Sequence, residues 1–315
     1  MWLQSEKPLL LLAPMDGYTD GPFRCLIKKI APECLVFTEF LSAREMAQGS
    51  KNLLDKLRFK AIEHPVIVQL YGKDPEDFVT SSKIAQDHGA AGIDINMGCP
   101  SKKVVAHSHG SALMKDIDLS SRIIEKVRQN ISVPITVKTR LGWENHDQLI
   151  PFIQKLESAG LQGITIHGRT YRQKFSGSAN WDPIYSLKRE VAIPVFGNGD
   201  IVDGWTAKQR LKNLDGVMVG RAILTNPWVV AEVRNHLFFE EKDFPSPPPF
   251  HQVAALWMEF VEDGAAIMGE RRACLRFRKF MIQIVQARRP DSGLRREATQ
   301  IESIQSIQTL MNKLL

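Results

Sequence analysis

The chain has 315 residues, and its hydrophobic content of 43% is enough for a sizeable packed core in one large domain or in a domain with an appendage. A formal charge of +6 and an isoelectric point near 9.1 permit a polyanionic partner without requiring one. The 4 cysteines lie far apart with no CxxC pair, which argues against a disulfide framework and a metal site, so we expect reduced thiols and no bound metal.

The first residues lack the features of a secretory signal. They show no basic start, no long apolar run and no small-residue cleavage site. The first apolar stretch, residues 9–13, is far too short to span a bilayer. We therefore expect a cytoplasmic protein that does not enter a membrane.

Short aliphatic or β-branched runs alternate with longer amphipathic patterns along most of the chain. This alternation is typical of a parallel sheet covered by helices. Eight such units predict an α/β fold of the closed (β/α)8 type, the TIM barrel. The alternative is an open doubly wound sheet, which usually carries an early GxGxxG motif that this chain lacks. The predicted strands are residues 9–13, 35–39, 65–70, 92–97, 134–140, 163–167, 194–198 and 216–220.

A proline-rich segment, residues 243–250, interrupts the pattern, because neither a helix nor a strand continues through it. Beyond this segment, apolar residues recur at helical spacing in three stretches. We therefore predict a catalytic barrel domain over residues 1–242, a linker over residues 243–250 and a C-terminal helical-bundle domain over residues 251–315.

The carboxyl ends of the predicted strands carry an unusual number of polar residues. In a (β/α)8 barrel these ends meet at one rim, where the active sites of this fold lie. Each residue alone has a structural explanation, such as Gln69 filling a layer of the barrel or His167 being a satisfied core histidine. Together they predict a ligand site.

The last two strand ends are glycine-rich, at residues 198–200 and 220–221. Loops at these two positions usually form the phosphate site of this fold, so a phosphorylated cofactor or substrate is implied. Lys138 can supply a fixed positive charge to an electron-rich ring. Gln69 and Asn96 can each donate and accept hydrogen bonds, as recognition of an isoalloxazine or pyrimidine edge requires.

Seven motifs occur in a fixed order from the first strand to the eighth. They are Ala13-Pro14-Met15-Asp16-Gly17, Val68-Gln69-Leu70, Asp94-Ile95-Asn96-Met97-Gly98-Cys99-Pro100 followed by Gly110-Ser111-Ala112-Leu113, Val137-Lys138-Thr139-Arg140-Leu141-Gly142, Ile166-His167-Gly168-Arg169-Thr170, Gly197-Asn198-Gly199-Asp200 and Gly220-Arg221-Ala222. In these motifs the chain resembles the FMN-dependent tRNA-dihydrouridine synthases. The resemblance runs from Leu10 to about Arg221 and more weakly into the tail.

The resemblance implies an oxidoreductase that reduces the C5–C6 bond of specific uridines in tRNA, with FMN as the cofactor and NADPH as the reductant. The partners expected are tRNA and NADPH, and we expect a monomer. The resemblance gives the catalytic role to Cys99. It gives FMN binding to Pro14, Met15, Asp16, Gln69, Lys138, His167, Asn198, Gly199, Asp200, Gly220 and Arg221.

The chemistry of this reduction explains a thiol at position 99. The uracil ring needs a hydride at C6 and a proton at C5, and a reduced flavin supplies only the hydride. A cysteine thiol with a pKa of about 8.5 is mostly protonated at neutral pH, yet it is acidic enough to protonate an enolate, so we predict Cys99 as the proton donor. We expect Asn96 to help orient the base, and residues 101–109 to form a lid.

The C-terminal region carries a local excess of basic residues. On one helix Arg272, Arg276 and Lys279 fall at positions i, i+4 and i+7 and share a face, whereas Cys274 and Phe277 turn inward. We expect this basic face to bind the phosphates of tRNA. The alternative is a solvated charged face, because like charges so close together repel one another.

Three other functions stay open from the residues alone. The first is an FMN-dependent oxidoreductase of a free pyrimidine, similar to the dihydroorotate dehydrogenases, which would not need a basic tail. The second is an RNA-binding protein whose barrel has lost catalysis and would not hold FMN. The third is a nucleophilic pair of Cys99 with His107 or His109 as the base, for which the surrounding motifs offer no hydrolase explanation.

Overall fold

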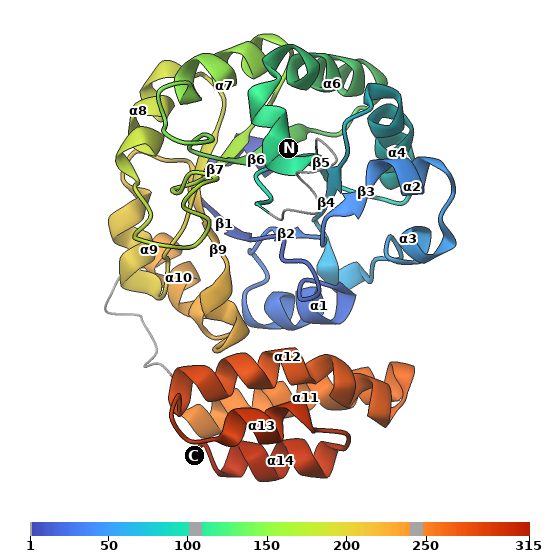
Figure 1. Ribbon diagram of the computed structural model, residues 1–315, viewed down its shortest axis with the longest axis vertical. Coiled ribbons are helices and arrows are strands. Elements are labelled where there is room, and N and C mark those ends of the chain that lie inside the picture. The colour runs from blue at the N-terminus through green and yellow to red at the C-terminus, as the bar shows by residue number, and fades with distance from the viewer. Residues whose placement is uncertain (1, 101–108, 240–247) are drawn as a thin grey trace.

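A ring of parallel strands surrounded by helices forms most of the molecule (Figure 1). The computed structural model describes residues 2–100, 109–239 and 248–315. The sheet order is β1-β9-β8-β7-β6-β5-β4-β2, and a parallel bridge between Leu11 and Leu35 joins the two ends of this order. The predicted TIM barrel is therefore confirmed. The strands are β1 (Leu9–Leu12), β2 (Val36–Phe37), β3 (Leu41–Ser42), β4 (Val66–Tyr71), β5 (Gly92–Met97), β6 (Ile135–Arg140), β7 (Ile164–His167), β8 (Val195–Asn198) and β9 (Gly216–Val219).

Within the second predicted strand, residues 35–39, the structure has only the short strand β2, and the short strand β3 follows beyond the predicted end; both pair with β4. Between them the N–H of Gln69 donates to the side-chain Oγ1 of Thr38 at 3.1 Å, where a regular ladder would use a backbone carbonyl. A hydroxyl that replaces a ladder carbonyl interrupts the strand locally. The chain therefore bends between β2 and β3.

The connections between strands follow the βα pattern, and several helices begin where the sequence supplies a capping side chain. Asp20 accepts a hydrogen bond from the N–H of Phe23 at the start of α1, and Asp74 caps α4 in the same way. The helices of the barrel are α1 (Gly21–Ile30), α2 (Ala43–Ala47), α3 (Lys51–Asp55), α4 (Pro75–Asp87), α6 (Ile117–Asn130), α7 (Leu149–Ser158), α8 (Asp182–Glu190), α9 (Gly204–Leu211) and α10 (Val229–Phe238), with 3-10 turns η1 (Trp2–Gln4), η2 (Ala61–Glu63), η3 (Gly110–Lys115) and η4 (Arg221–Leu224).

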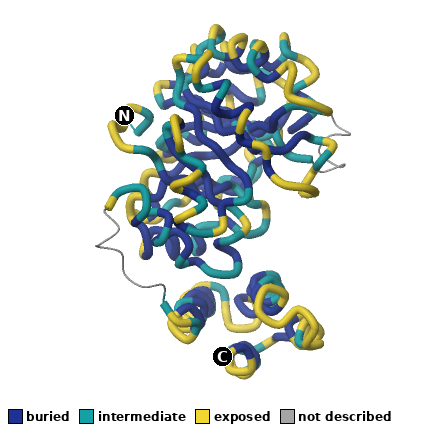
Figure 2. The backbone as a smooth tube through the Cα atoms, turned by 90° about the vertical axis from the view of Figure 1, so that its left-hand side faces the viewer, coloured by how far each residue is buried: buried dark blue, intermediate teal, exposed yellow. Residues whose placement is uncertain are grey.

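The amino ends of the strands are closed by the first residues of the chain. The indole N–H of Trp2 donates to the carbonyl of Ala91 at 2.9 Å, directly before β5. A side chain at Gly163 would come within 3.0 Å of Leu3, which shows how closely η1 fits against this end. The strands themselves are buried on both faces, as the dark blue centre of Figure 2 shows. Access to the barrel interior is therefore left to the carboxyl ends of the strands.

Four helices follow the barrel: α11 (Phe250–Met268), α12 (Glu270–Arg288), α13 (Leu294–Thr299) and α14 (Ile304–Asn312). They lie against α1 in Figure 1. Cys274 and Phe277 are buried, as the helical spacing predicts. We call these helices the helical domain. Most of the predicted linker, residues 243–247, lies outside the described residues. None of the helices that the structure describes is both long and apolar enough to cross a bilayer.

The helical domain packs on α1 through aromatic rings. The ring of Phe23 stacks on Trp257 with centroids 6.2 Å apart and on Phe280 with centroids 5.3 Å apart. At the edge of this contact, Lys29 forms ion pairs with Glu259 at 2.5 Å and with Asp263 at 3.2 Å. The aromatic contact is buried, and it fixes the side of the barrel on which α12 lies.

Candidate functional site

A cavity of about 580 Å³ opens at the carboxyl ends of the strands. This size is typical of a small-molecule or cofactor site. The structure brings 12 of the predicted site residues together on its wall: Pro14, Met15, Asp16, Asn96, Cys99, Lys138, His167, Asn198, Gly199, Asp200, Gly220 and Arg221. These residues lie at or after the carboxyl ends of β1 and of β5 to β9, so this part of the rim forms a single site.

Cys99 lies half-buried on the cavity wall, two residues beyond the end of β5. Its backbone N–H donates to Asn96 Oδ1 at 2.9 Å, and the N–H of Gly98 donates to the same oxygen at 3.0 Å. On the other side of the turn, Arg140 Nε donates to the carbonyl of Gly98 at 2.8 Å. The backbone of the turn is therefore held by two side chains from β5 and β6.

The other cysteines differ from Cys99 because all three are buried away from this cavity. Burial raises the pKa of Cys25 and of Cys274, and it raises the pKa of Cys34 to about 12. A buried thiol with a raised pKa is a poor nucleophile and a poor metal ligand. Cys99 is thus the cysteine placed for chemistry at the rim.

Gln69 is fully buried and lies below the cavity wall. Its amide Nε2 donates to Asp94 Oδ2 at 2.7 Å, and its Oε1 accepts from Asn96 Nδ2 at 2.9 Å. Burial raises the pKa of Asp94 to about 6, and hydrogen bonds from Gln69 and Thr136 oppose that rise. Gln69 therefore contacts a residue of the cavity wall, Asn96.

Two cations from β6 form one side of the cavity. Lys138 Nζ donates to Asn198 Oδ1 at 3.3 Å, and Asn198 in turn donates to the carbonyl of Met218 at 2.7 Å. Burial, together with the charge of Arg140, lowers the pKa of Lys138 to about 8. Burial also lowers the pKa of Arg140 to about 10, but a guanidinium with this pKa is still charged at neutral pH. The wall between β5 and β8 is therefore positive.

His167, at the end of β7, is a neutral imidazole. Burial lowers its pKa far below the ordinary range, and the charges of Lys138, Arg140, Arg169 and Arg221 lower it further. Arg169 Nη1 lies 3.4 Å from His167 Nε2. Because a guanidinium can only donate, this geometry places the ring proton on Nδ1. His167 can therefore donate one hydrogen bond to an uncharged or anionic ligand.

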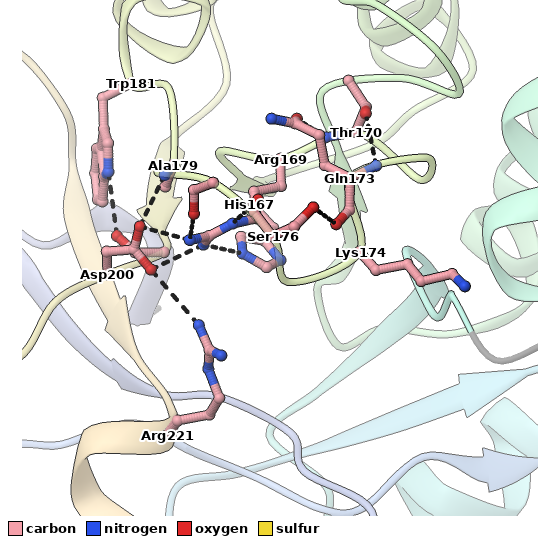
Figure 3. Close-up of polar contacts among 12 residues, drawn as sticks. His167, Arg169, Thr170, Gln173, Lys174, Ser176, Ala179, Trp181, Asp200 and Arg221 are labelled. Carbon is pink, nitrogen blue, oxygen red and sulfur yellow. Dashed lines mark hydrogen bonds and ion pairs between the residues drawn. The ribbon is translucent and has the colours of Figure 1, made fainter.

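An ion pair between buried Arg169 and partly exposed Asp200 fixes the loop after β8 (Figure 3). Arg169 Nη1 donates to Asp200 Oδ1, and Arg169 Nη2 donates to Asp200 Oδ2, each at 2.8 Å. Burial alone would raise the pKa of Asp200, but the bonds from Arg169 and from the N–H of Ala179 lower it. Arg221 Nη2 approaches the same carboxylate at 3.5 Å and remains half-exposed. The loops after β7, β8 and β9 are thus tied together, with one guanidinium still open to the cavity.

The loop after β8 approaches its neighbours so closely that only glycine fits. Gly199 has a φ of +124°, and a Cβ there would lie 2.8 Å from Ala179 Cβ and 3.0 Å from His167 Cδ2. After β9, the N–H groups of Arg221 and Ala222 begin η4 and have no acceptor within the described part of the chain. Open N–H groups beside a guanidinium form a suitable site for an anion.

The helical domain reaches the same cavity. Gln283 of α12 lines it, and Tyr18, also on the wall, packs edge to face on Phe280 with centroids 5.2 Å apart. Lys279 Nζ lies 5.0 Å from the centroid of the Tyr18 ring. Burial lowers the pKa of Lys279, and the charge of Arg276 lowers it further. The helix α12 therefore contributes to the cavity wall through Gln283 and supports Tyr18 from behind.

The predicted basic face of α12 is divided by the structure. Arg276 is partly buried against the barrel, where it forms an ion pair with Asp20. Lys279 is also partly buried, beside Tyr18. Arg272 is exposed to solvent. None of the three lines the cavity of the barrel.

Several residues on the cavity wall were not predicted as site residues. The sequence could have indicated Arg140, because it is the last residue of the same predicted strand as Lys138. Tyr18 and Phe175 lie in loops beyond the strand ends, and Gln283 lies in another domain, so strand periodicity does not indicate them. Residues 101–108, which include most of the predicted lid and His107, lie outside the described residues. Where the chain is described, no cluster of three or more metal-ligating side chains occurs.

Comparison with known proteins gives matches over most of the chain. Residues 11–314 match the family model described as dihydrouridine synthase. A probable tRNA-dihydrouridine synthase of Rickettsia conorii is 42% identical over 244 residues, which are 75% of this chain and 73% of that protein. The tRNA-dihydrouridine synthase B of Proteus vulgaris is 35% identical over 303 residues, which are 94% of this chain and 92% of that protein.

Solved structures share the barrel at much lower identity. Histamine dehydrogenase from Rhizobium sp. 4-9 superposes with a TM-score of 0.55 at 12% identity, over 72% of this chain and 45% of that chain. A 2-naphthoyl-CoA reductase bound to 2-naphthoyl-CoA gives a TM-score of 0.58 at 9% identity, over 75% of this chain and 52% of that chain. At these identities the likeness shows the fold alone.

Proposed function

The chain belongs to the dihydrouridine synthase family, and from this premise we propose that it reduces uridines of tRNA with FMN as the cofactor, NADPH as the reductant and Cys99 as the proton donor. The single observation that carries the proposal is that Cys99 shares one cavity with the glycine-rich loops after β8 and β9. The match to residues 11–314 includes the helical domain, so an enzyme of free pyrimidines is not favoured.

The residues on the cavity wall fit a flavin mononucleotide. Gly199 lets the loop after β8 lie close to Ala179 and His167, where a Cβ would clash, and the open N–H groups of Arg221 and Ala222 suit a phosphoryl group. Lys138 supplies a positive charge on the wall of the cavity, and His167 supplies a neutral donor. Both groups suit the polar edge of an electron-rich ring. Bound there, the cofactor would supply the hydride that C6 of the uracil receives.

The other FMN-binding residues proposed are Pro14, Met15, Asp16, Asn198, Asp200 and Gly220, all of which lie on the wall. Asp200 acts through the loop geometry that its ion pair with Arg169 fixes. Gln69 lies below the wall. We propose that it supports cofactor binding indirectly, by accepting a hydrogen bond from Asn96, which lines the cavity.

Cys99 delivers the proton that the cofactor cannot supply. The hydride adds to C6 of the uracil with both electrons of the new C–H bond, and the charge that develops passes to C5 and its neighbouring carbonyl. The thiol then transfers its proton to C5, and the thiolate left behind regains a proton from solvent. The cations Lys138 and Arg140 on the same wall stabilise the negative charge that develops on the base. Asn96, next to the thiol, orients the base.

We propose a division of labour between the two parts of the chain. The barrel, residues 1–242, binds the cofactor and performs the reduction. The helical domain, residues 251–315, binds tRNA, and Arg272 is the residue of the basic face that is open to a phosphate. Lys279, beside Tyr18 of the cavity wall, contributes where the extruded uridine must enter, and Arg276 contributes by holding α12 against the barrel through Asp20. A tRNA substrate and reduced thiols are consistent with a cytoplasmic monomer, which we also propose.

The proposal is tested with purified protein and tRNA from a strain that lacks this gene. The protein should bind FMN, should be reduced by NADPH, and should introduce dihydrouridine into that tRNA but not into free uridine. Mass spectrometry of the tRNA identifies the modified position. Turnover of free uridine or orotate at a comparable rate would contradict the tRNA substrate, and a protein that cannot bind FMN would contradict the cofactor.

A further inference from the structure

Asp94 takes no part in the chemistry derived above, yet its carboxylate is fully buried below the cavity wall. We infer that Asp94 is a positioning residue which, through the side-chain amides of Gln69 and Asn96, fixes the turn that carries Cys99. The inference deepens the proposed function, because it rests on Cys99 as the proton donor.

Five residues form an unbroken series of hydrogen bonds from the barrel interior to the rim. Asp94 Oδ2 accepts from Gln69 Nε2 at 2.7 Å, and Gln69 Oε1 accepts from Asn96 Nδ2 at 2.9 Å. Asn96 Oδ1 then accepts from the N–H of Cys99 at 2.9 Å and from the N–H of Gly98 at 3.0 Å. Three of the side chains are less than a tenth exposed, so water does not compete for these bonds.

The direction of the whole series is set at Asp94. An ionised carboxylate can only accept hydrogen bonds, so Gln69 must turn its NH2 group toward Asp94 and its oxygen toward Asn96. Asn96 must then turn its own NH2 group toward Gln69 and its oxygen toward the turn. A reversed amide at either position would place two donors or two acceptors face to face, which costs the full desolvation of both groups.

The second oxygen of Asp94 supports the same direction. Asp94 Oδ1 accepts from Thr136 Oγ1 at 2.7 Å, so the hydroxyl of the neighbouring strand β6 also donates. Burial raises the pKa of Asp94 to about 6, and both hydrogen bonds favour the ionised form. The acceptor-only form therefore predominates at neutral pH.

The last member of the series decides where the thiol lies. Asn96 Oδ1 caps two successive N–H groups, and Arg140 holds the carbonyl of Gly98 at 2.8 Å from the opposite side. If Asn96 were reversed, its NH2 group would face the two N–H groups and the turn would open. A displacement of about 1 Å at a reacting group can lower a rate about 100-fold. A buried carboxylate below the rim thus controls the position of the proton donor.

A polarity exchange tests the series without removing any side chain. Gln69→Glu alone places two carboxyl groups in contact and should lower hydride-and-proton transfer to tRNA about tenfold, as expected for one lost hydrogen bond. In the double variant Asp94→Asn/Gln69→Glu, an amide donates to a carboxylate and the carboxylate still accepts from Asn96. The double variant should recover most of the lost rate. If it is no faster than Gln69→Glu, the inference is overturned.

A second readout does not depend on the role of Cys99 in catalysis. Because the other three cysteines are buried, the rate of alkylation of the FMN-free protein by iodoacetamide reports on Cys99. Asp94→Ala and Asn96→Ala should change the alkylation rate by the same factor. The variant that combines both substitutions, Asp94→Ala/Asn96→Ala, should show no further change. Multiplicative effects, or an unchanged rate in Asp94→Ala, would overturn the inference.

The two readouts separate the inference from the proposed function. If alkylation responds as predicted while Cys99→Ala still forms dihydrouridine at the wild-type rate, the positioning series stands and the proton-donor role falls. Asp215→Ala is the control, because it removes a carboxylate that accepts from the N–H of Val195 at 2.7 Å, at the amino end of β8 and therefore at the opposite end of the barrel from Cys99. This variant should leave both the alkylation rate and the transfer rate at the wild-type value.

Discussion

Arg276 in the helical domain forms an ion pair with Asp20, the residue that caps α1 of the barrel. One carboxylate oxygen of Asp20 accepts from the N–H of Phe23 at 3.3 Å, and the other meets the guanidinium. Burial lowers the pKa of Arg276 to about 10, which still leaves it charged at neutral pH. The ion pair therefore joins the two domains, whereas Arg272, one helical turn away, faces solvent.

These positions predict different effects for two arginines of one helix face. Arg272→Ala should weaken tRNA binding and reduce the slope of log K against log salt concentration by about 1, because one phosphate contact is lost. Its free energy of unfolding should stay unchanged. Arg276→Ala should instead lower the free energy of unfolding by about 1 kcal/mol, because the partly buried Asp20 loses its partner. Binding titrations at several salt concentrations and urea denaturation measure both, and an unchanged slope in Arg272→Ala would contradict the phosphate contact.

The close approach at Gly199 predicts a loss of cofactor binding. Gly199→Ala should lower the free energy of unfolding by about 2–4 kcal/mol, from the unfavourable backbone conformation and the overlap with Ala179, and FMN affinity should fall at least about tenfold. Gly49→Ala is the control, since its φ is +77° and a Cβ there meets nothing within 4 Å. The control should lose about 1–2 kcal/mol with no change in FMN affinity. Equal FMN affinities in the two variants would contradict a cofactor site at this loop.

The lowered pKa of Lys138 predicts a pH dependence of stability in the FMN-free protein. Between about pH 8 and 10.5 the unfolded chain keeps a proton on Lys138 that the folded protein has lost, so the free energy of unfolding rises with pH across this window. The rise should reach about 3 kcal/mol in the wild type relative to Lys138→Met, which lacks this group. Denaturant unfolding at pH 7 to 10.5 measures it. A parallel pH profile in the two proteins would show that Lys138 is not buried in this way.

The barrel and most of its site could be predicted from the sequence, because the strands are apolar and are separated by helical patterns. A parallel barrel brings all carboxyl ends to one rim, so residues such as Lys138 and His167 needed no knowledge of distant contacts. The strand boundaries agree closely except at residues 35–39, where the side chain of Thr38 replaces a ladder carbonyl. Such a local exchange leaves no trace in a hydrophobic pattern.

Side-chain direction and domain contact could not be predicted in the same way. Gln69 lies near the carboxyl end of β4, as other site residues do in their strands, but its bonds to Asp94 and Asn96 depend on the stagger between neighbouring strands. The spacing of Arg276 and Arg272 places both on one face of α12. It does not indicate that Arg276 contacts the barrel whereas Arg272 faces solvent. Contacts between the two domains depend on rings such as Phe23, which periodicity identifies only as core residues.

The most direct measurement is single-turnover transfer from protein already reduced by NADPH to unmodified tRNA. Cys99→Ala should bind FMN and be reduced by NADPH like the wild type, and its rate of dihydrouridine formation should fall about 100- to 10,000-fold, the usual contribution of a general acid. Cys274→Ala, which removes a buried thiol in α12, serves as the control and should transfer at the wild-type rate. Dihydrouridine formation by Cys99→Ala at the wild-type rate would contradict a thiol proton donor.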